Sequence, residues 1–409
     1  MKTAIKEIKV GLDFGSGIQP VGRLAIRNGI IYFEYDNDFL QTELEISPIK
    51  LPLQRGVIGL PRDPFEGLAG VFNDSLPDGW GRLLFDRMLR SEGILPSEVT
   101  LLDRLAHVGL HGLGALVYEP DESPNFDDEI IDLDVLASQT KEVLEGGSDE
   151  VIAELLALNG SSAGARPKAL IGVDKERKNI SYGAHQLSDG SEPWMVKFPN
   201  SQDGNDSGSI EYVYALMATE AGIAMPNVHL FSSQKGNGYF AVKRFDREGN
   251  ERLHMHTVSG LIHSNLRFPS LDYEDLLSLT SFLTKDIREV EKMFRLAVFN
   301  VMAHNQDDHA KNFSFLMNEL GEWKLSPAYD LTFSNGPGGE QSTMVLGEGR
   351  NITLQHLLKL GTEAQLSKNF IESVIDQTRS ALGKWTDLAK YYGVSDSNIN
   401  FINRSISKW

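Results

Sequence analysis

The segment 301–334 holds three oxygen-bearing side chains in a fixed order, and this order constrains both the fold and the chemistry of the chain. The segment reads VMAHNQDDHAKNFSFLMNELGEWKLSPAYDLTFS. Asp307 and Asn312 stand five positions apart, and Asp330 follows two apolar runs that flank a polar turn and predict a hairpin over 312–325. Phosphoryl transfer requires a carboxylate beside the attacking hydroxyl and oxygen ligands for Mg²⁺. An Asp-x-x-x-x-Asn loop followed by an Asp after a hairpin is typical of kinases, so the segment predicts a kinase catalytic loop.

The overall composition is that of a globular protein. With 409 residues, the chain is long enough for two or three domains. Apolar residues make up 41% of the chain and charged residues 23%, which argues against disorder. The formal charge of −18, from 39 basic and 57 acidic residues, disfavours direct binding to nucleic-acid phosphates. The absence of cysteine excludes disulfides, zinc–thiolate sites and cysteine nucleophiles.

The N-terminus and the apolar runs give no targeting signal. The first residues, MKTAIKEIKVGLDFG, lack the apolar core of a signal peptide. No uninterrupted apolar run approaches the length that spans a membrane. We therefore expect a cytoplasmic protein with no membrane partner.

The first third of the chain is predicted to be rich in β-strands. Residues 1–60 contain short β-branched runs separated by turn formers, and Asn28-Gly29 is a hairpin signal. A helix is predicted over 79–91, with Asp74 or Ser75 as its cap. Because no side chain of this third has obvious chemistry, we expect a structural or partner-binding domain.

Small residues form a candidate phosphate-binding loop in the segment 159–168, NGSSAGARPK. Ser161, Ser162, Ala163 and Gly164 let the backbone approach a phosphate and donate N–H groups to it. A strand is predicted to follow, which is the kinase arrangement and not a Walker A loop. An ordinary turn is the alternative. Ser161 and Ser162 are candidate phosphorylation sites, and turn or capping chemistry is their alternative.

Further candidate residues follow in the order that kinases use. Lys197 ends a predicted strand and resembles the lysine that pairs nucleotide phosphates, although such a lysine is also common at solvated strand edges. Glu211 begins a predicted helix, where it suits either an ion pair with Lys197 or the helix dipole. Lys243 and Phe245 fall on the strand that would lead to an adenine-binding hinge.

Two other classes of function stay open from the residues alone. Asp307, Asp308 and His309, with His304 nearby, also suit a metal-dependent hydrolase or nuclease. Further histidines that such a metal site would need are available: His254, His256 and His263. The other class is a catalytically silent nucleotide-binding protein that recruits a basic partner. The kinase prediction is favoured because all of its parts occur in kinase order.

From His254 onward the pattern is mostly helical, with predicted helices over 273–283, 284–304, 365–392 and 396–408. We therefore expect an α+β, two-lobed, protein-kinase-like fold. Its predicted parts are a β-rich N-terminal subdomain (1–120), an α/β region with the phosphate loop (130–247) and an all-helical C-terminal lobe with the catalytic loop (248–409).

The chain resembles the HipA-type serine/threonine kinases, the toxins of bacterial type II toxin–antitoxin systems. The resemblance rests on motifs spread over nearly the whole chain: FEGLAGVFNDSLPDGWGR, GSSAGARPK, WMVKFP, RFDR, DDHAKNFS and SPAYDLTFS. The sequence departs from the commoner family pattern at Arg166-Pro167, where many relatives carry Gln-Glu, and at Asp308, where a small residue or Arg is frequent.

The resemblance implies a role for each matched residue. Asp307 would be the catalytic aspartate, with His309 and Lys311 positioning the loop or neutralising charge. Asn312 and Asp330 would hold Mg²⁺. The residues expected to hold ATP are Lys197, Lys243, Phe245 and the phosphate loop. Ser161, or its neighbour Ser162, would be autophosphorylated, which silences the enzyme. The resemblance further implies a protein substrate in translation, such as an aminoacyl-tRNA synthetase, and a DNA-binding antitoxin as partner.

Overall fold

A computed structural model describes most of the chain. The described residues are 4–124, 130–146, 150–159, 164, 166–182, 187, 190–200, 204–249, 251–264, 271–336 and 338–409. Ser161, Ser162 and Ala163 of the predicted phosphate loop lie outside them. The chain divides into two compact units. The first comprises Met1–Gln202, Ala241–Ser264 and Leu316–Glu322, and the second comprises Asp203–Phe240, Asn265–Phe315 and Trp323–Trp409. The three linear domains expected from the sequence stay a prediction.

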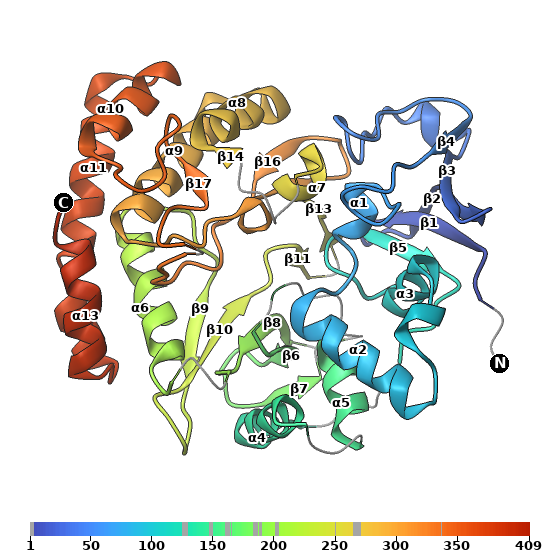
Figure 1. The fold of residues 1–409 in the computed structure, drawn as a ribbon, viewed down its shortest axis with the longest axis horizontal. Coiled ribbons are helices and arrows are strands. Elements are labelled where there is room, and N and C mark those ends of the chain that lie inside the picture. The colour runs from blue at the N-terminus through green and yellow to red at the C-terminus, as the bar shows by residue number, and fades with distance from the viewer. Residues whose placement is uncertain are drawn as a thin grey trace. The chain divides into compact units, whose positions relative to one another are not determined.

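The first unit opens with a five-stranded antiparallel sheet in the order β4-β3-β2-β1-β5 (Figure 1). Its strands are β1 (Glu7–Asp13), β2 (Ile18–Arg27), β3 (Ile30–Tyr35), β4 (Val57–Gly59) and β5 (Leu116–Glu119). Asn28 and Gly29 join β2 to β3 with φ values of 53° and 75°, so the predicted hairpin turn is confirmed. Buried aromatic rings such as Phe33 and Phe72 form the core against this sheet.

In the first unit, α-helices lie between β4 and β5 in the chain, and another comes much later. They are α1 (Gly70–Asn73), α2 (Gly79–Ser91), α3 (Leu101–Val108) and α7 (Val258–Ile262), the last of which follows strand β13 (His254–Thr257). A Cβ on Gly70 would overlap the backbone of Gly260, so α1 and α7 pack backbone against backbone. The predicted cap of α2 is wrong: Asp78 occupies its N-cap, whereas Asp74 ends α1 and binds the β13–α7 segment instead.

A second sheet of the first unit carries the predicted phosphate-binding elements. Within this unit its strands follow the order β7-β6-β8-β10. They are β6 (Lys168–Val173), β7 (Ile180–Tyr182), β8 (Glu192–Lys197) and β10 (Tyr239–Lys243). Helix α5 (Glu150–Asn159) packs against β6, and it also contacts α4 (Leu133–Leu144) and α2. The short strands β11 (Arg247–Glu248) and β12 (Glu251–Arg252) form a ribbon after β10.

Helices dominate the second unit, and α11 contacts both α6 and α9 within it (Figure 1). Its helices are α6 (Ser207–Glu220), α8 (Tyr273–Thr284), α9 (Ile287–Met302), α10 (Leu354–Glu363), α11 (Lys368–Leu382), α12 (Trp385–Tyr391) and α13 (Asp396–Ile406). The helix predicted over 365–392 is two helices, because α11 ends at Gly383, a residue with little helical preference.

Short strands complete the second unit and confirm the α+β class. They are β9 (Val228–Phe231), β14 (Leu271–Asp272), β15 (Ser314–Met317), β16 (Trp323–Leu325) and β17 (Thr343–Met344). The strands β15 and β16 match the predicted hairpin before Asp330, while β14 and β17 pair in parallel. The segment Leu316–Glu322, which holds the end of β15 and the turn of the hairpin, belongs to the first unit.

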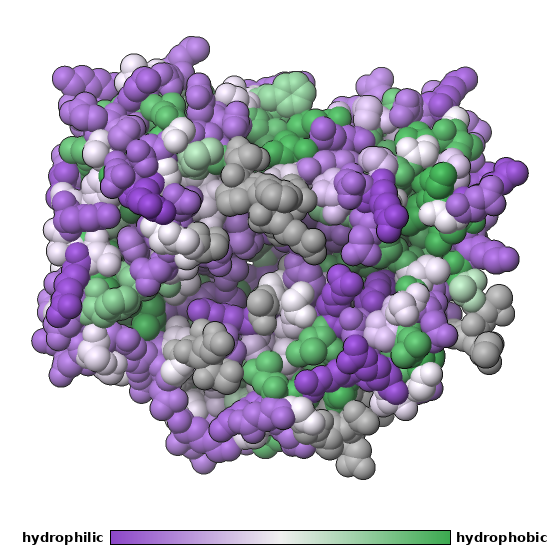
Figure 2. All heavy atoms as spheres, in the orientation of Figure 1, coloured by the Kyte–Doolittle hydropathy of each residue, from purple (hydrophilic) through white to green (hydrophobic). Residues whose placement is uncertain are grey.

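Hydrophilic side chains predominate on the face shown in Figure 2. Among the helices of the described residues, none combines the length and the apolar character that crossing a bilayer requires.

Candidate active site

The loop that carries Asp307 is closed by its own side chains. The side-chain amide of Asn312 donates to the backbone carbonyl of Asp307 at 2.7 Å. Between them, residues Ala310–Asn312 form one 3₁₀ turn, and the ring nitrogen of His309 accepts from the backbone N–H of Lys311 at 3.3 Å. The predicted spacing of Asp307 and Asn312 therefore brings both residues together at the start of β15.

Asp330 follows the hairpin in an unusual backbone conformation. Its φ is +59°, in the left-handed region that residues other than glycine seldom adopt. The preceding residue ties this segment to the loop: the Tyr329 hydroxyl donates to the carbonyl of Lys311 at 2.7 Å and lies 2.5 Å from the Ser314 hydroxyl. Left-handed residues with a β-carbon often occur at functional sites, where the surrounding structure offsets their strain. The contacts of Tyr329 hold the backbone just before Asp330 to the loop of Lys311 and Ser314.

Asp307 and Asp308 are neighbours in the chain but differ completely in exposure. Asp307 is exposed, whereas Asp308 is fully buried. The carboxylate of Asp308 accepts hydrogen bonds from the Tyr273 hydroxyl at 2.5 Å, the Gln341 amide at 2.9 Å and the Thr343 backbone at 3.1 Å. Burial raises the pKa of Asp308 to about 7, against the effect of these hydrogen bonds. Asp308 thus faces the protein interior and does not share a metal ion with its neighbour.

The three histidines that a metal-dependent hydrolase would need are engaged elsewhere, in the first unit. His254 donates to the carbonyl of Ile46 at 2.8 Å, and burial lowers its pKa to about 3. His263 accepts from the backbone N–H of Gly70 at 3.0 Å, and its pKa is lowered to about 4, chiefly by burial. His256 lies 2.6 Å from the carboxylate of Asp74. Among the described residues, no group of three His, Asp or Glu side chains is arranged to hold a metal ion.

Asp74, His256 and Ser47 line up as an acid–histidine–hydroxyl series. The second ring nitrogen of His256 lies 3.0 Å from the Ser47 hydroxyl, so the order of contacts is that of a hydrolase triad. Ser47 and His256, however, are fully buried, and no substrate reaches them in this conformation. Asp74 also accepts from the backbone and the hydroxyl of Thr257, each at 2.8 Å. The series therefore joins α1 to the β13–α7 segment.

Lys197 lies opposite a second lysine that the sequence analysis did not select. In the antiparallel pairing of β6 and β8, Lys168 stands directly across from Lys197, so both side chains leave the same face of the sheet. Lys168 is only 5% exposed, and a Cβ on Gly164 would lie 2.5 Å from its ammonium group. Like charges directly opposite each other are unfavourable unless negative charge lies near them. The sequence could have indicated Lys168 as a candidate, because this residue ends the small-residue loop motif.

Gly164 of the predicted phosphate loop is held at both of its backbone polar groups. Its N–H donates to the carboxylate of Asp78, and its carbonyl accepts from the N–H of Trp80 at 3.1 Å. Its φ of +106° is one that glycine adopts readily. Asp78 and Trp80, at the start of α2, therefore fix the loop at Gly164. The helix-capping pattern in the sequence did not predict this contact.

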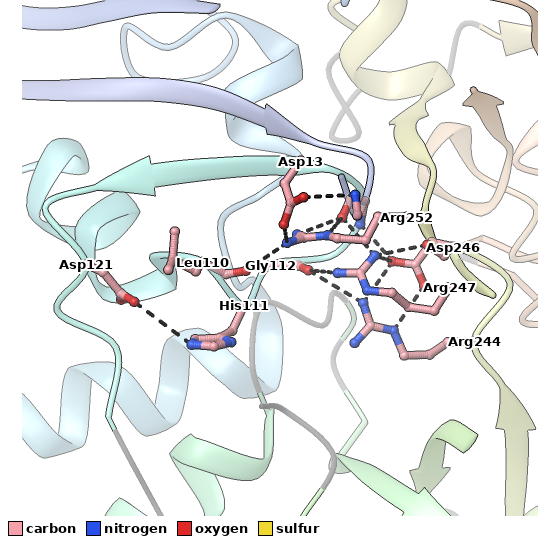
Figure 3. A network of polar contacts seen from close by, with 11 residues as sticks. Asp13, Leu110, His111, Gly112, Asp121, Arg244, Asp246, Arg247 and Arg252 are labelled. Atoms are coloured by element: carbon pink, nitrogen blue, oxygen red, sulfur yellow. Dashed lines mark hydrogen bonds and ion pairs between the residues drawn. The ribbon is translucent and has the colours of Figure 1, made fainter. Parts of the chain in front are cut away.

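The predicted hinge residues Lys243 and Phe245 are neighbours in sequence of a buried ionic network. Figure 3 shows its members Arg244, Asp246 and Arg247. Asp246 binds Arg244 and Arg247, each at 2.8 Å. Burial opposes the ionisation of Asp246, but the charges and hydrogen bonds of the two arginines outweigh it and lower the pKa of Asp246. The arginines also bind backbone carbonyls, among them those of Gly112 and Gly114. This network fixes the backbone on both sides of Phe245.

Lys243 and Glu211, the remaining predicted ATP-binding residues, lie in different units. The ammonium of Lys243 pairs with Glu192 on the neighbouring strand at 2.7 Å, so its side chain is committed to the sheet. Glu211 is buried in α6, with 3% of its surface exposed. Because Glu211 belongs to the second unit and Lys197 to the first, the ion pair expected between them stays a prediction.

Two family models match this chain. The model described as "HipA N-terminal domain" matches residues 15–119, and the "HipA-like C-terminal domain" matches residues 160–385, more than half of the chain. The chain belongs to the HipA family. Among curated proteins, it is similar to "Putative kinase Y4dM" of Sinorhizobium fredii, with 25% identity over 90% of this chain and 88% of the relative. It is also similar to "Putative kinase Y4mE" of the same organism, with 24% identity over 93% of each chain.

Solved structures support the same fold. A chain of the Shewanella oneidensis complex of HipA, HipB and operator DNA aligns with a TM-score of 0.67 and 17% identity, over 97% of this chain and 95% of the other. The expected resemblance to HipA and the expected fold class are thereby confirmed.

Proposed function

We propose that this HipA-family protein is a serine/threonine protein kinase that transfers the γ-phosphate of ATP to a protein hydroxyl. The observation that carries the proposal is the closed loop of Asp307 and Asn312, followed by Asp330 in its left-handed conformation. Two relatives are named as kinases, which supports the same reaction.

In the second unit, Asp307 orients the acceptor hydroxyl and accepts its proton. Its exposure suits this role, because the acceptor must reach it from solvent. Asn312 and Asp330 supply the oxygen ligands for Mg²⁺, and this donor set suits a hard cation. Mg²⁺, when bound, neutralises the negative charge of the phosphates. His309 and Lys311 shape the turn between Asp307 and Asn312.

In the first unit, Lys197 binds the phosphates of ATP, and Lys168 adds a second charge on the same face of the sheet. Ser161, Ser162 and Ala163, which lie outside the described residues, and the adjoining Gly164 belong to the proposed phosphate loop, and Asp78 holds this loop at the N–H of Gly164. The backbone at Lys243 and Phe245 meets the adenine. Two lysines on one face of the sheet suit a polyphosphate. Glu211, in the second unit, is the remaining residue proposed for ATP binding.

The finer parts of the proposal follow the family. The protein would act in the cytoplasm as a toxin, and its substrate would belong to the translation machinery, such as an aminoacyl-tRNA synthetase. Autophosphorylation at Ser161 or Ser162 would silence it. The solved Shewanella complex contains HipB and operator DNA beside HipA, which supports a DNA-binding antitoxin as the partner of this chain.

The full-length chain incubated with γ-labelled Mg-ATP and a cytosolic protein extract tests the proposal. We expect label in at least one extract protein with the wild type and none with Asp307→Ala, while both bind ATP equally in calorimetry. Asp387→Ala, at an exposed position of α12, is the matched control and should behave as wild type.

Equal labelling with Asp307→Ala would contradict the proposal. ATP binding without any labelling would indicate a silent nucleotide-binding protein, and turnover of phosphoesters without ATP would indicate a hydrolase.

A further inference from the structure

Asp308 belongs to a closed ring of buried hydrogen bonds. The Tyr273 hydroxyl, which donates to Asp308, accepts from the Asn300 amide at 3.0 Å. The Asn300 side-chain oxygen accepts from the Asn305 amide at 2.9 Å. The Gln341 amide donates both to the Asn305 carbonyl at 2.8 Å and to Asp308 at 2.9 Å, which closes the ring. The ring joins the start of α8, the end of α9 and the residues just before Asp307.

The segment 341–343, here called the strap, also holds the backbone of this loop residue by residue. The strap residue Ser342 donates to the carbonyl of Gln306 with its hydroxyl at 2.7 Å and its N–H at 3.1 Å. The hydroxyl of Thr343 donates to the carbonyl of Asp308. The carbonyl between these two belongs to Asp307 and is taken by Asn312. Four successive carbonyls, those of residues 305–308, are thus engaged, and the backbone of Asp307 is fixed on both sides.

We propose that Asp308 is a positioning residue: with the strap, it fixes the loop so that the exposed carboxylate of Asp307 meets the acceptor hydroxyl at one place. This inference rests on the proposed kinase function. Asp308 touches neither ATP nor acceptor, and it acts through the backbone that it shares with Asp307.

The chemistry of the ring explains why the residue is an aspartate. Three donors converge on it, a phenol, an amide and a backbone N–H. A carboxylate accepts all three, whereas an asparagine offers one acceptor oxygen and turns its own N–H groups toward donors. An alanine leaves all three donors buried without an acceptor. Burial raises the pKa of Asp308 to about 7, whereas the three hydrogen bonds favour the charged carboxylate that accepts them.

The first test measures the rate at which the full chain consumes γ-labelled Mg-ATP, counted as label in protein plus label in inorganic phosphate. We expect Asp308→Ala to lower kcat about 100-fold, because small displacements of a catalytic group have effects of this size, and to leave the KM for ATP unchanged. Asp308→Asn should lower kcat less than Asp308→Ala does. Thr280→Val is the control, since it removes a buried hydroxyl of α8 that donates only within that helix; it should leave kcat unchanged.

The second test measures hydrogen exchange of the backbone amides in 303–316. Exchange there should increase in Asp308→Ala and Thr343→Val, and not in Thr280→Val. A folded Asp308→Ala protein with wild-type kcat, or with unchanged exchange in 303–316, would overturn the positioning role. If Asp308→Ala does not fold, Thr343→Val takes its place in both tests. This milder variant keeps the backbone N–H bond to Asp308, and wild-type kcat or unchanged exchange in 303–316 would overturn the positioning role.

The control Asp307→Asn separates this inference from the proposed function. We expect it to lose label consumption but to show wild-type exchange in 303–316. If Asp307→Asn instead consumes ATP at the wild-type rate, the proposed function is wrong. Asp308 then has no catalytic residue to position, so the positioning role is wrong as well. If Asp307→Asn is inactive and Asp308→Ala is as active as wild type, only the positioning role fails.

Discussion

The side-chain amide nitrogen of Asn312 donates to the backbone carbonyl of Asp307 at 2.7 Å, so Asn312 is placed to serve the site twice. Its nitrogen closes the loop, and its oxygen is the proposed ligand for Mg²⁺. We expect Asn312→Ala to lower phosphate transfer about 100-fold, in the range seen when a supporting metal-site group is removed. Asn312→Asp keeps a ligand oxygen but sets a carboxylate against the carbonyl of Asp307, so kcat should fall while the Mg²⁺ requirement does not rise.

The measurement for Asn312 is a titration of label transfer with Mg²⁺. Asn351→Ala, at an exposed position of the same unit, is the control. A Mg²⁺ requirement that is unchanged in Asn312→Ala would contradict its assignment as a ligand.

Replacing Asp330 with glycine should abolish activity while leaving the stability of the protein nearly unchanged. Because its φ is +59°, a glycine at this position relieves backbone strain, and Asp330→Gly should stay within about 1 kcal/mol of the wild-type free energy of unfolding. Its carboxylate is lost, so phosphate transfer should disappear. Gln365→Gly is the matched control, since Gln365 has a φ of +60° and lies beyond the end of α10; it should be as stable and fully active. Transfer that survives in Asp330→Gly would remove Asp330 from the site.

Local signals explain what could be predicted from the sequence. The spacing of Asp307 and Asn312 is short, and the bond between them spans only that loop. The helix at 79–91 and the hairpin before Asp330 are likewise set by neighbouring residues. The misses depend on distant partners. Asp74 looked like a cap, but it binds residues 256 and 257. No pattern near Asp308 indicates that it binds the strap, more than thirty residues later.

Asp78 is expected to influence nucleotide binding through Gly164. It stands at the N-cap of α2, yet its carboxylate accepts from the N–H of Gly164 in the proposed phosphate loop. Asp78→Ala should therefore raise the KM for ATP several-fold, while Asp78→Asn, which keeps an acceptor oxygen, should do so less. The control is Asp132→Ala, because Asp132 is an N-cap that bonds only the first turn of α4 in the contacts described. Its loss should cost about 1 kcal/mol of stability without a change in the KM. Equal KM values for Asp78→Ala and Asp132→Ala would contradict the role of Asp78.

The buried His254 should make the stability of the protein depend on pH below neutrality. Burial lowers its pKa from 6.5 to about 3 in the folded protein, so below pH 6.5 the unfolded chain binds a proton that the folded chain does not. Its contribution to the free energy of unfolding is therefore complete above pH 6.5 and decreases as the pH falls toward 3, by up to about 1.4 kcal/mol per pH unit. Urea unfolding at pH 7.5, 6, 5 and 4 measures this slope. His254→Gln, which retains a donor for the Ile46 carbonyl, should flatten the slope, whereas His356→Gln, at a half-buried position of α10, should not. Parallel curves for wild type and His254→Gln would show that His254 titrates alike in the folded and unfolded states.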